Sequence, residues 1–141
     1  MLNKKTKYAF HALTYIGKDT SEKRIQVKAI AEKTNISKKF LETILLELKN
    51  NGILGSKSGI GGGYFLLKPA NEVQLATIFR LFNGPIALLS CASINYYEKC
   101  EDCKDEINCG LRKIMMQVRD ETLNILQKKT LQDIIDSEEI S

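Results

Sequence analysis

The sequence predicts a mainly α-helical chain with one small β-hairpin, in which a winged helix-turn-helix domain is followed by a long C-terminal helix. Three observations favour this fold class. Two short amphipathic helices meet at an asparagine, a glycine-rich turn between two apolar runs follows them, and an apolar stripe at helical spacing recurs near the C-terminus. Hydrophobic residues make up 43% of the 141 residues, which suits one domain with a real core, and no apolar run approaches the roughly 20 residues of a bilayer span.

The first two helices are predicted from the spacing of small and apolar residues. About residues 4–17 carry one apolar face, formed by Ala9, Ala12, Leu13 and Ile16. After a charged loop at 18–23, a second short helix is carried by Val27, Ile30 and Ala31. It is expected to end at Asn35, because asparagine is the residue other than glycine that best tolerates a left-handed backbone.

A third helix and a hairpin follow directly. Ser37 suits an N-cap, and the buried stripe behind it comprises Phe40, Leu41, Ile44, Leu45 and Leu48. The period then changes, because residues 53–57 and 64–67 are apolar-rich runs on either side of the glycine-rich segment 59–63. This pattern indicates a β-hairpin. A helix-turn-helix followed at once by a hairpin defines a winged helix.

Two more helices are expected beyond the hairpin. Residues 74–83 return to helical spacing and are stopped by Gly84-Pro85. The last long helix, about residues 109–129, carries the stripe Leu111, Ile114, Met115, Val118, Ile125 and Leu126. This stripe is too apolar for a lone helix protruding from a small domain, so we expect a dimer seam; the alternative is packing on the chain's own core. The acidic tail after Thr130 is expected to fray at its end.

Charge is divided unevenly along the chain. Residues 1–70 hold 13 Lys and Arg against 5 Asp and Glu, whereas residues 71–141 hold 8 against 12. A basic half joined to an acidic half is typical of a polyanion-binding module coupled to a second function, with ordinary surface charge as the alternative. The first residues do not resemble a signal peptide, so we expect a cytoplasmic protein without a membrane segment. An enzyme is not expected, because no catalytic arrangement can be built around His11, the only histidine.

The helix-turn-helix predicts binding to double-stranded DNA. The start of the second helix of such a motif enters the major groove, and here it exposes a hydroxyl, two ammonium groups and a carboxylate that can accept from cytosine. The wing glycines leave backbone amides open to a phosphate or to the minor groove. A nucleotide-binding loop would require a helix after the glycine turn, whereas this turn joins two strands. The predicted DNA-contacting residues are Lys5, Ser37, Lys38, Lys39, Glu42, Thr43, Lys57, Gly59, Gly61 and Gly62.

All four cysteines of the chain lie within one short polar segment, at Cys91, Cys100, Cys103 and Cys109. In a reducing cytoplasm, thiolates this close together select iron–sulfur clusters or zinc, and the spacing of Cys100 and Cys103 is common in metal sites. The residues between them are too polar for a buried core. We therefore predict a metal site, an iron–sulfur cluster or zinc, with metal-free thiol oxidation as the alternative.

Several of these motifs together resemble the bacterial Rrf-two (Rrf2) family of winged-helix transcriptional regulators. The resemblance covers about residues 1–130 and is carried by Lys7-Tyr8-Ala9, Phe40-Leu41-Glu42, the wing 59–64, Asn83-Gly84-Pro85 and the cysteine segment before a long helix. It implies a homodimer whose long helices cross, with each cysteine loop near the partner's DNA-binding domain. It also implies that the cluster state sets DNA affinity, and that Cys91, Cys103 and Cys109 are the family's three cysteines.

The chain departs from the family pattern at three positions. Arg112 stands where the [2Fe–2S] branch has a histidine, and Lys7 stands where the nitric-oxide-sensing branch has an aspartate. Cys100 is additional and can supply the missing fourth ligand. The type of cluster is therefore open.

The sequence as a whole predicts a homodimeric transcriptional regulator that reads a palindromic operator and is modulated by a cluster or by thiol state. The alternative is a zinc-stabilised interaction module or a metal-free thiol switch. We expect a DNA-binding domain at residues 1–84, a cysteine-bearing sensor loop at 85–110, and a dimerisation helix with an acidic tail at 111–141.

Overall fold

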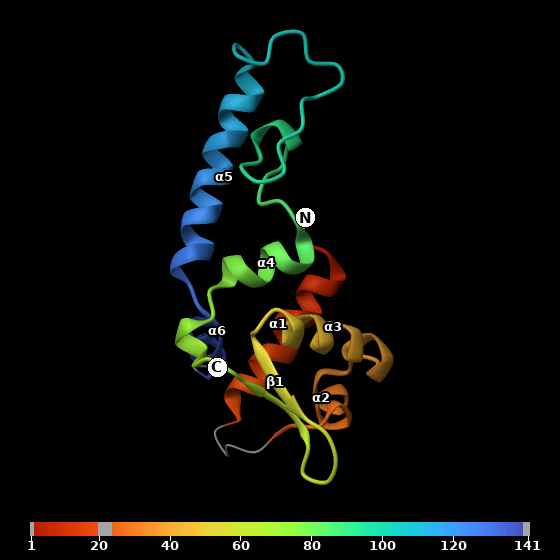
Figure 1. Cartoon of the computed structure of the whole chain (residues 1–141). Coiled ribbons are helices and arrows are strands. Elements are labelled where there is room, and N and C mark those ends of the chain that lie inside the picture. The colour runs from red at the N-terminus through yellow and green to blue at the C-terminus, as the bar shows by residue number, and fades with distance from the viewer. Residues whose placement is uncertain (1, 20–23, 140–141) are drawn as a thin grey trace.

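The helix-turn-helix and its wing form as the periodicity predicts. The computed structural model describes residues 2–19 and 24–139. The elements in chain order are α1 (Lys4–Lys18), α2 (Val27–Thr34), α3 (Lys38–Asn50), β1 (Leu54–Lys57), β2 (Gly63–Leu66), α4 (Leu75–Asn83), α5 (Gly110–Lys128) and α6 (Leu131–Glu139), with 3-10 turns η1 (Ala70–Glu72) and η2 (Ser90–Ala92). Figure 1 shows α1–α3 and the hairpin as one body, from which α5 stands away.

The turn between α2 and α3 has the geometry that the sequence indicates. Asn35 adopts φ 57° and ψ 35°, the left-handed conformation that ends α2. The Ser37 hydroxyl accepts a hydrogen bond from the Phe40 amide at 3.3 Å and so caps α3. Behind these exposed turns the two helices share a fully buried apolar face, formed by Ile30, Leu41, Ile44, Leu45 and Leu48.

The two-stranded wing is extended by an isolated β-bridge that the sequence did not reveal. β1 and β2 pair antiparallel, with Leu54 opposite Leu66 and Lys57 opposite Gly63. Ile25 adds a bridge on the other side of β2, because its amide donates to the Tyr64 carbonyl at 2.9 Å and its carbonyl accepts from the Tyr64 amide at 2.8 Å. Gly63 permits this approach, since a Cβ at its φ of 140° would lie 2.5 Å from the Ile25 oxygen.

α1 is the centre of the core. Its buried face consists of the residues expected from their spacing, Ala9, Ala12, Leu13 and Ile16. α1 contacts α2, α3, α4, α6 and β2. Its N-terminus is fixed to the end of α4, because the Asn3 amide donates to Asn83 Oδ1 at 2.7 Å and Asn3 Nδ2 donates to the Phe82 carbonyl at 2.9 Å. The same Asn3 side chain caps α1 by accepting from the Thr6 amide.

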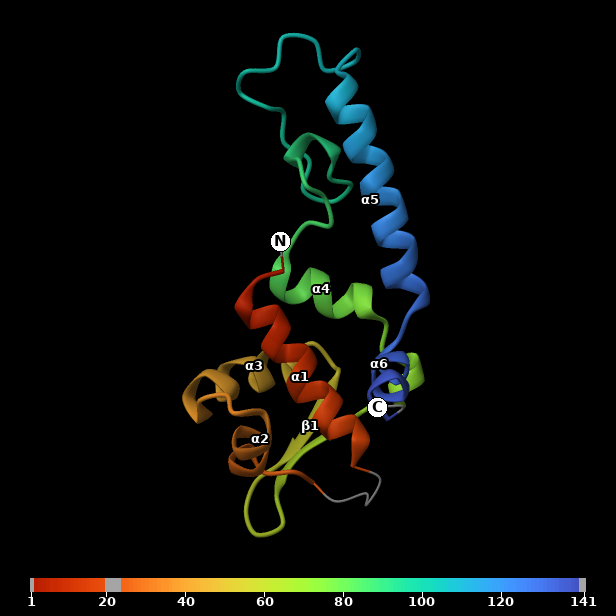
Figure 2. The same ribbon diagram turned by 180° about the vertical axis from the view of Figure 1, so that it is seen from behind.

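Most of the acidic tail is folded, whereas the fraying expected at its end falls on residues 140–141, which lie outside the described residues. Residues 131–139 form α6, which packs beside the C-terminal half of α1 (Figure 2). Leu131 and Ile135 of α6 are buried, and Lys18 of α1 forms an ion pair with Glu138 at 2.5 Å. Gly17 leaves room for this helix, because a Cβ there would lie 2.7 Å from Ile135 Cδ1. Two buried residues four apart in a charged segment were too weak a periodic signal to predict the helix.

α5 is the one long helix without a buried residue. Figure 2 shows it beside the segment that leads through η2 to the cysteines, away from α1–α3. Its chain returns to the body through backbone hydrogen bonds, from the Leu75 amide to the Lys129 carbonyl at 3.1 Å and from the Leu131 amide to the Val73 carbonyl at 2.9 Å. No helix among residues 2–19 and 24–139 is long and apolar enough to span a membrane.

We predict that Leu131→Ala lowers the free energy of unfolding by about 2–5 kcal/mol, because it removes a fully buried side chain that joins α6 to the core. Urea unfolding at matched protein concentration measures the effect. Leu67→Ala, at a half-exposed leucine after β2, is the control and should change the free energy by less than about 0.5 kcal/mol. Equal small effects of the two substitutions would show that α6 does not stabilise the body.

Candidate DNA-binding surface and cysteine pocket

The start of α3 presents an exposed polar surface. Ser37, Lys38, Lys39, Glu42 and Thr43 are all exposed, as predicted for a helix that enters a groove. The Thr43 hydroxyl donates to the Lys39 carbonyl at 3.4 Å, and the Ser37 hydroxyl is used by the N-cap. Within the described part of the chain, neither the Lys38 nor the Lys39 ammonium lies in an ion pair. Both charges are therefore available to an anionic partner, next to the positive end of the helix dipole.

The wing loop depends on its glycines. Gly59 and Gly61 have φ values of 90° and 74°, and the loop is closed by a 3.0 Å hydrogen bond from the Gly62 amide to the Gly59 carbonyl. A Cβ at Gly62 would overlap the carbonyl oxygen of Lys57. Both views of the ribbon place this loop and the start of α3 at the end of the molecule remote from α5 (Figures 1 and 2).

Lys5 differs from the other predicted DNA-contacting residues. Its ammonium forms an ion pair with Glu47 near the end of α3 and lies 5.7 Å from the centre of the Phe82 ring. The side chain is about one-third exposed, so its charge is already engaged by the protein. The structure therefore gives Lys5 a contact within the fold, while its role toward DNA stays a prediction.

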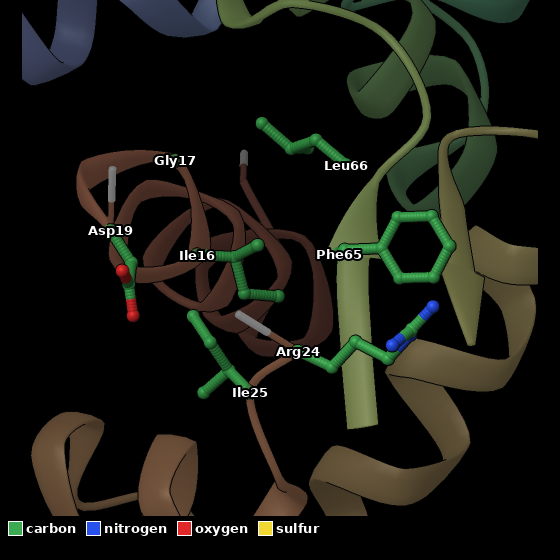
Figure 3. A pocket seen from close by; sticks show the side chains of 7 residues that line it. All are labelled: Ile16, Gly17, Asp19, Arg24, Ile25, Phe65 and Leu66. Carbon is green, nitrogen blue, oxygen red and sulfur yellow. The ribbon is translucent and has the colours of Figure 1, made fainter. Parts of the chain in front are cut away.

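Arg24 is a basic residue of the wing that the sequence analysis did not single out. Its guanidinium carbon lies 5.5 Å from the centre of the Phe65 ring, and Figure 3 shows the side chain extended along the base of the hairpin. It borders a pocket of about 360 Å³ lined by Ile16, Gly17, Asp19, Arg24, Ile25, Phe65 and Leu66. The signal in the sequence was a basic residue directly before the β-branched Ile25, but the predicted loop ended at residue 23 and neither Arg24 nor Ile25 was assigned to an element.

The four cysteines line one cavity. It has a volume of about 540 Å³ and is bordered by the four cysteines, by Leu89 and Leu111, and by the polar residues Asp102, Lys104, Asp105 and Arg112. Cys91 is buried in η2, and the Cys100 Sγ donates to its Sγ at 3.7 Å. Cys109 is the N-cap of α5, and its Sγ accepts from the Arg112 amide at 3.4 Å. The structure thus brings the predicted cysteines to a single pocket.

Two arginines of α5 hold η2, which carries Cys91, against α5 beside this pocket. Arg112 Nε donates to the Cys91 carbonyl at 3.1 Å, and Arg119 Nη1 donates to the Ala92 carbonyl at 2.7 Å. Arg112 also lies 3.6 Å from Glu106, which accepts a hydrogen bond from the Tyr97 hydroxyl and so raises the pKa of Tyr97. Arg112 therefore positions the backbone of a cysteine instead of offering a metal ligand. The spacing of seven residues between the arginines was the overlooked signal.

The pocket fits a thiolate-ligated group by its chemistry, with one pair of thiols already adjacent. Four sulfur donors around one cavity suit iron–sulfur clusters and zinc. In the described residues, no group of three or more His, Cys, Asp or Glu side chains is gathered closely enough to hold a metal ion. The hydrogen bond to Cys91, with burial, raises the pKa of Cys100, so ligation requires loss of a proton that the pair holds.

The fold, the exposed start of α3 and the glycine wing define a winged-helix transcriptional regulator. Residues 2–137 match the Rrf2 family model, which is described as an iron-dependent transcriptional regulator. The chain belongs to the Rrf2 family.

Individual relatives agree with this family. A Rhodobacter capsulatus protein named as an rrf2-like HTH-type transcriptional regulator is 36% identical over 138 residues, which cover 96% of this chain and 92% of the relative. The regulator NsrR of Oceanobacillus iheyensis is 28% identical over 98% of this chain and 91% of its own length. The structure of CymR, the global cysteine regulator of B. subtilis, superimposes with a TM-score of 0.79 at 26% identity, covering 97% of both chains.

Proposed function

We propose that this regulator acts as a cytoplasmic homodimer that reads a palindromic operator with α3 and the wing, under control of a cluster or of thiol state at the four cysteines. The observation that carries the proposal is the pair of unengaged lysines at the start of α3, beside a glycine wing, in a chain of the Rrf2 family. We take residues 1–84 as the DNA-binding domain and 85–110 as the sensor loop. Within the segment 111–141, α5 dimerises and α6 packs on the DNA-binding body.

Each exposed group has a chemical role toward DNA. Lys38 and Lys39 neutralise phosphates, and the hydroxyls of Ser37 and Thr43 position the helix. Glu42 accepts a hydrogen bond from a cytosine amino group in the major groove. In the wing, Lys57 adds charge, and the backbone at Gly59, Gly61 and Gly62 approaches a phosphate or the minor groove. Lys5 contributes to the basic surface only where its ion pair with Glu47 opens.

The double substitution Lys38→Ala and Lys39→Ala should weaken DNA binding and flatten its salt dependence. A homodimer presents four of these ammonium groups, so if each neutralises one phosphate, the slope of log K against log salt falls by about 3.6. Fluorescence anisotropy with a bound DNA fragment, measured at several salt concentrations, gives the slope.

Lys49→Ala is the matched control, because Lys49 is an exposed lysine at the other end of the same helix. We expect its slope and affinity to stay within error of the parent protein. A double variant that kept the parental slope would remove the start of α3 from the DNA interface.

The uncovered face of α5 supports a homodimer. Leu111, Ile114 and Ile125 are 58%, 56% and 58% exposed, and Val118 lies on the same stripe. Their spacings of three, four and seven residues are those of a coiled-coil seam. The partner that covers this stripe is a second copy of the chain, because a two-fold axis packs the stripe of one copy against that of the other. The dimer then has two DNA-binding domains, one for each half of a palindrome.

Ile114→Glu is predicted to raise the dimer dissociation constant at least about 100-fold, because it places two unpaired carboxylates in the seam. Sedimentation equilibrium measures the constant. Leu67→Glu, at a comparably exposed leucine on the DNA-binding body, serves as the control and should leave dimerisation unchanged. Identical behaviour of the two variants would exclude α5 as the dimer interface.

The cysteine pocket supports a metal-dependent signal. Cys91, Cys100, Cys103 and Cys109 would hold the group, which supplies a signal by its presence, oxidation state or loss. Arg112 and Arg119 hold η2, and hence Cys91, against α5. A change at the pocket therefore acts directly on the proposed dimer helix. This arrangement links binding of a metal or cluster at the cysteines to the relative position of the two DNA-binding domains.

We predict that protein purified without oxygen contains iron and sulfide in equal amounts and is coloured. We expect iron because four thiolates around one cavity bind it with high affinity. Elemental analysis, sulfide determination and the visible spectrum are the measurements, with Cys103→Ala as the variant expected to lose colour.

Zinc without iron in the same sample would instead favour a structural zinc site. A colourless, metal-free sample would contradict ligation and leave thiol chemistry as the signal.

A further inference from the structure

Cys91 and Cys100 form a thiol pair that is distinct within the pocket. Their Sγ atoms lie 3.7 Å apart and form the one sulfur–sulfur hydrogen bond found among the described residues, while Cys103 acts on Cys100 only through its charge. Cys100 is the cysteine that the family resemblance does not account for. The two thiols can serve as metal ligands, and two adjacent thiols can also be oxidised to a disulfide.

The backbone enforces the approach of the two residues. The Glu98 amide donates to the Ser90 carbonyl at 3.1 Å and so closes the chain between η2 and Cys100. Inside this closed loop the Tyr96 amide donates to Ser93 Oγ at 3.0 Å, which fixes the reversal of the chain. Arg112 holds the other side of the pair through the Cys91 carbonyl. The backbone fold therefore keeps Cys91 and Cys100 close together, so that the short distance between their thiols does not depend on side-chain rotation alone.

We propose that Cys91 and Cys100 close into an intramolecular disulfide when the metal-free protein meets a hydroperoxide. This inference rests on the proposed function, in that it takes the cysteine pocket as the regulatory site. The disulfide would use two of the four thiols, so the oxidised form is unable to present the complete ligand set. Oxidation and metal loading then exclude each other at one pocket.

The reaction balances with the peroxide as the oxidant. Cys100 first loses the proton that it donates to Cys91, and its thiolate then attacks a peroxide oxygen. The O–O bond breaks, and the released hydroxide takes up that proton, which leaves a sulfenic acid and water. The Cys91 thiolate then attacks the sulfenic sulfur, the S–O bond breaks, and a second water leaves as the S–S bond forms. Two thiols are oxidised by two electrons, and one hydrogen peroxide is reduced to two waters.

Burial assigns the order of the two steps. Cys100 is half-buried and borders the open cavity, so a small peroxide reaches it first. Cys91 is 4% exposed and is positioned to resolve the sulfenic acid instead of reacting with solvent. The resulting bond would tie the loop at Cys100 to η2, which Arg112 and Arg119 already hold on α5.

The test uses the full chain, stripped of metal by a chelator without oxygen and then treated with hydrogen peroxide. Free thiols per chain should fall from four to two, and the mass of the intact protein should fall by two hydrogens. Digestion followed by mass spectrometry should find one cross-linked peptide that joins Cys91 to Cys100.

Four single serine variants provide the matched set. Cys103→Ser and Cys109→Ser should form the same cross-link as the parent, whereas Cys91→Ser and Cys100→Ser should not form it. The peptide map of the parent protein decides the question even if a variant fails to fold. A dominant cross-link through Cys103 or Cys109, or oxidation to sulfinic acid without any disulfide, would overturn the proposal.

A second readout separates this inference from the function on which it rests. DNA affinity of the reduced protein tests the regulator, whereas the peptide map tests the disulfide and requires no DNA. A disulfide found in a protein that binds no DNA would sink the proposed function alone. DNA binding by a protein that forms no such disulfide would sink this inference alone.

Discussion

The burial of α1 is the constraint on which the rest of the molecule depends. Its apolar face is covered by both helices of the helix-turn-helix. Its two ends contact α4 and α6, which are the points where the segment between them, called the arm here because it carries the cysteines and α5, joins the rest of the chain. At the N-terminal end, Asn3 binds the last residues of α4, where the arm begins. At the C-terminal end, α1 packs on α6, which follows directly after α5. α1 therefore contacts both the ends of this arm and α3.

The two proposed sites lie at opposite ends of the chain, which limits how they can communicate. The wing and the start of α3 are remote from the cysteine loop in both views (Figures 1 and 2). Within the described residues, a group bound at the cysteine pocket has no direct contact with the DNA-binding surface of the same chain. Under the proposed function, coupling would therefore pass through α5 and α1 or through the second copy of the chain. The arginine contacts from α5 to η2 make α5 the first element to respond. In the proposed homodimer, a small shift of α5 would change the spacing of the two DNA-binding domains.

Sequence reasoning reached those features that depend on local chemistry. The αL turn at Asn35, the Ser37 cap and the apolar stripes were readable because each is fixed by a few neighbouring residues. Features that depend on long-range packing were missed. α6 packs on α1 because Leu131 and Ile135 occupy the space left by Gly17, and the bridge from Ile25 to Tyr64 forms because Gly63 allows the backbone of Ile25 to approach. The cysteine spacing predicted a shared pocket, but only the fold shows that Cys100 pairs with Cys91 and that Arg112 is held by a backbone carbonyl.

The central claim is that two copies of this chain read one two-fold symmetric DNA site. Selection of binding sites from random double-stranded DNA by the purified protein, followed by sequencing, tests it most directly. We expect enrichment of an inverted repeat whose half-sites are centred about 10 base pairs, or a multiple of that distance, apart. Enrichment of a single unpaired half-site would contradict the dimeric reading, and recovery of DNA without any sequence preference would contradict specific recognition by α3 and the wing.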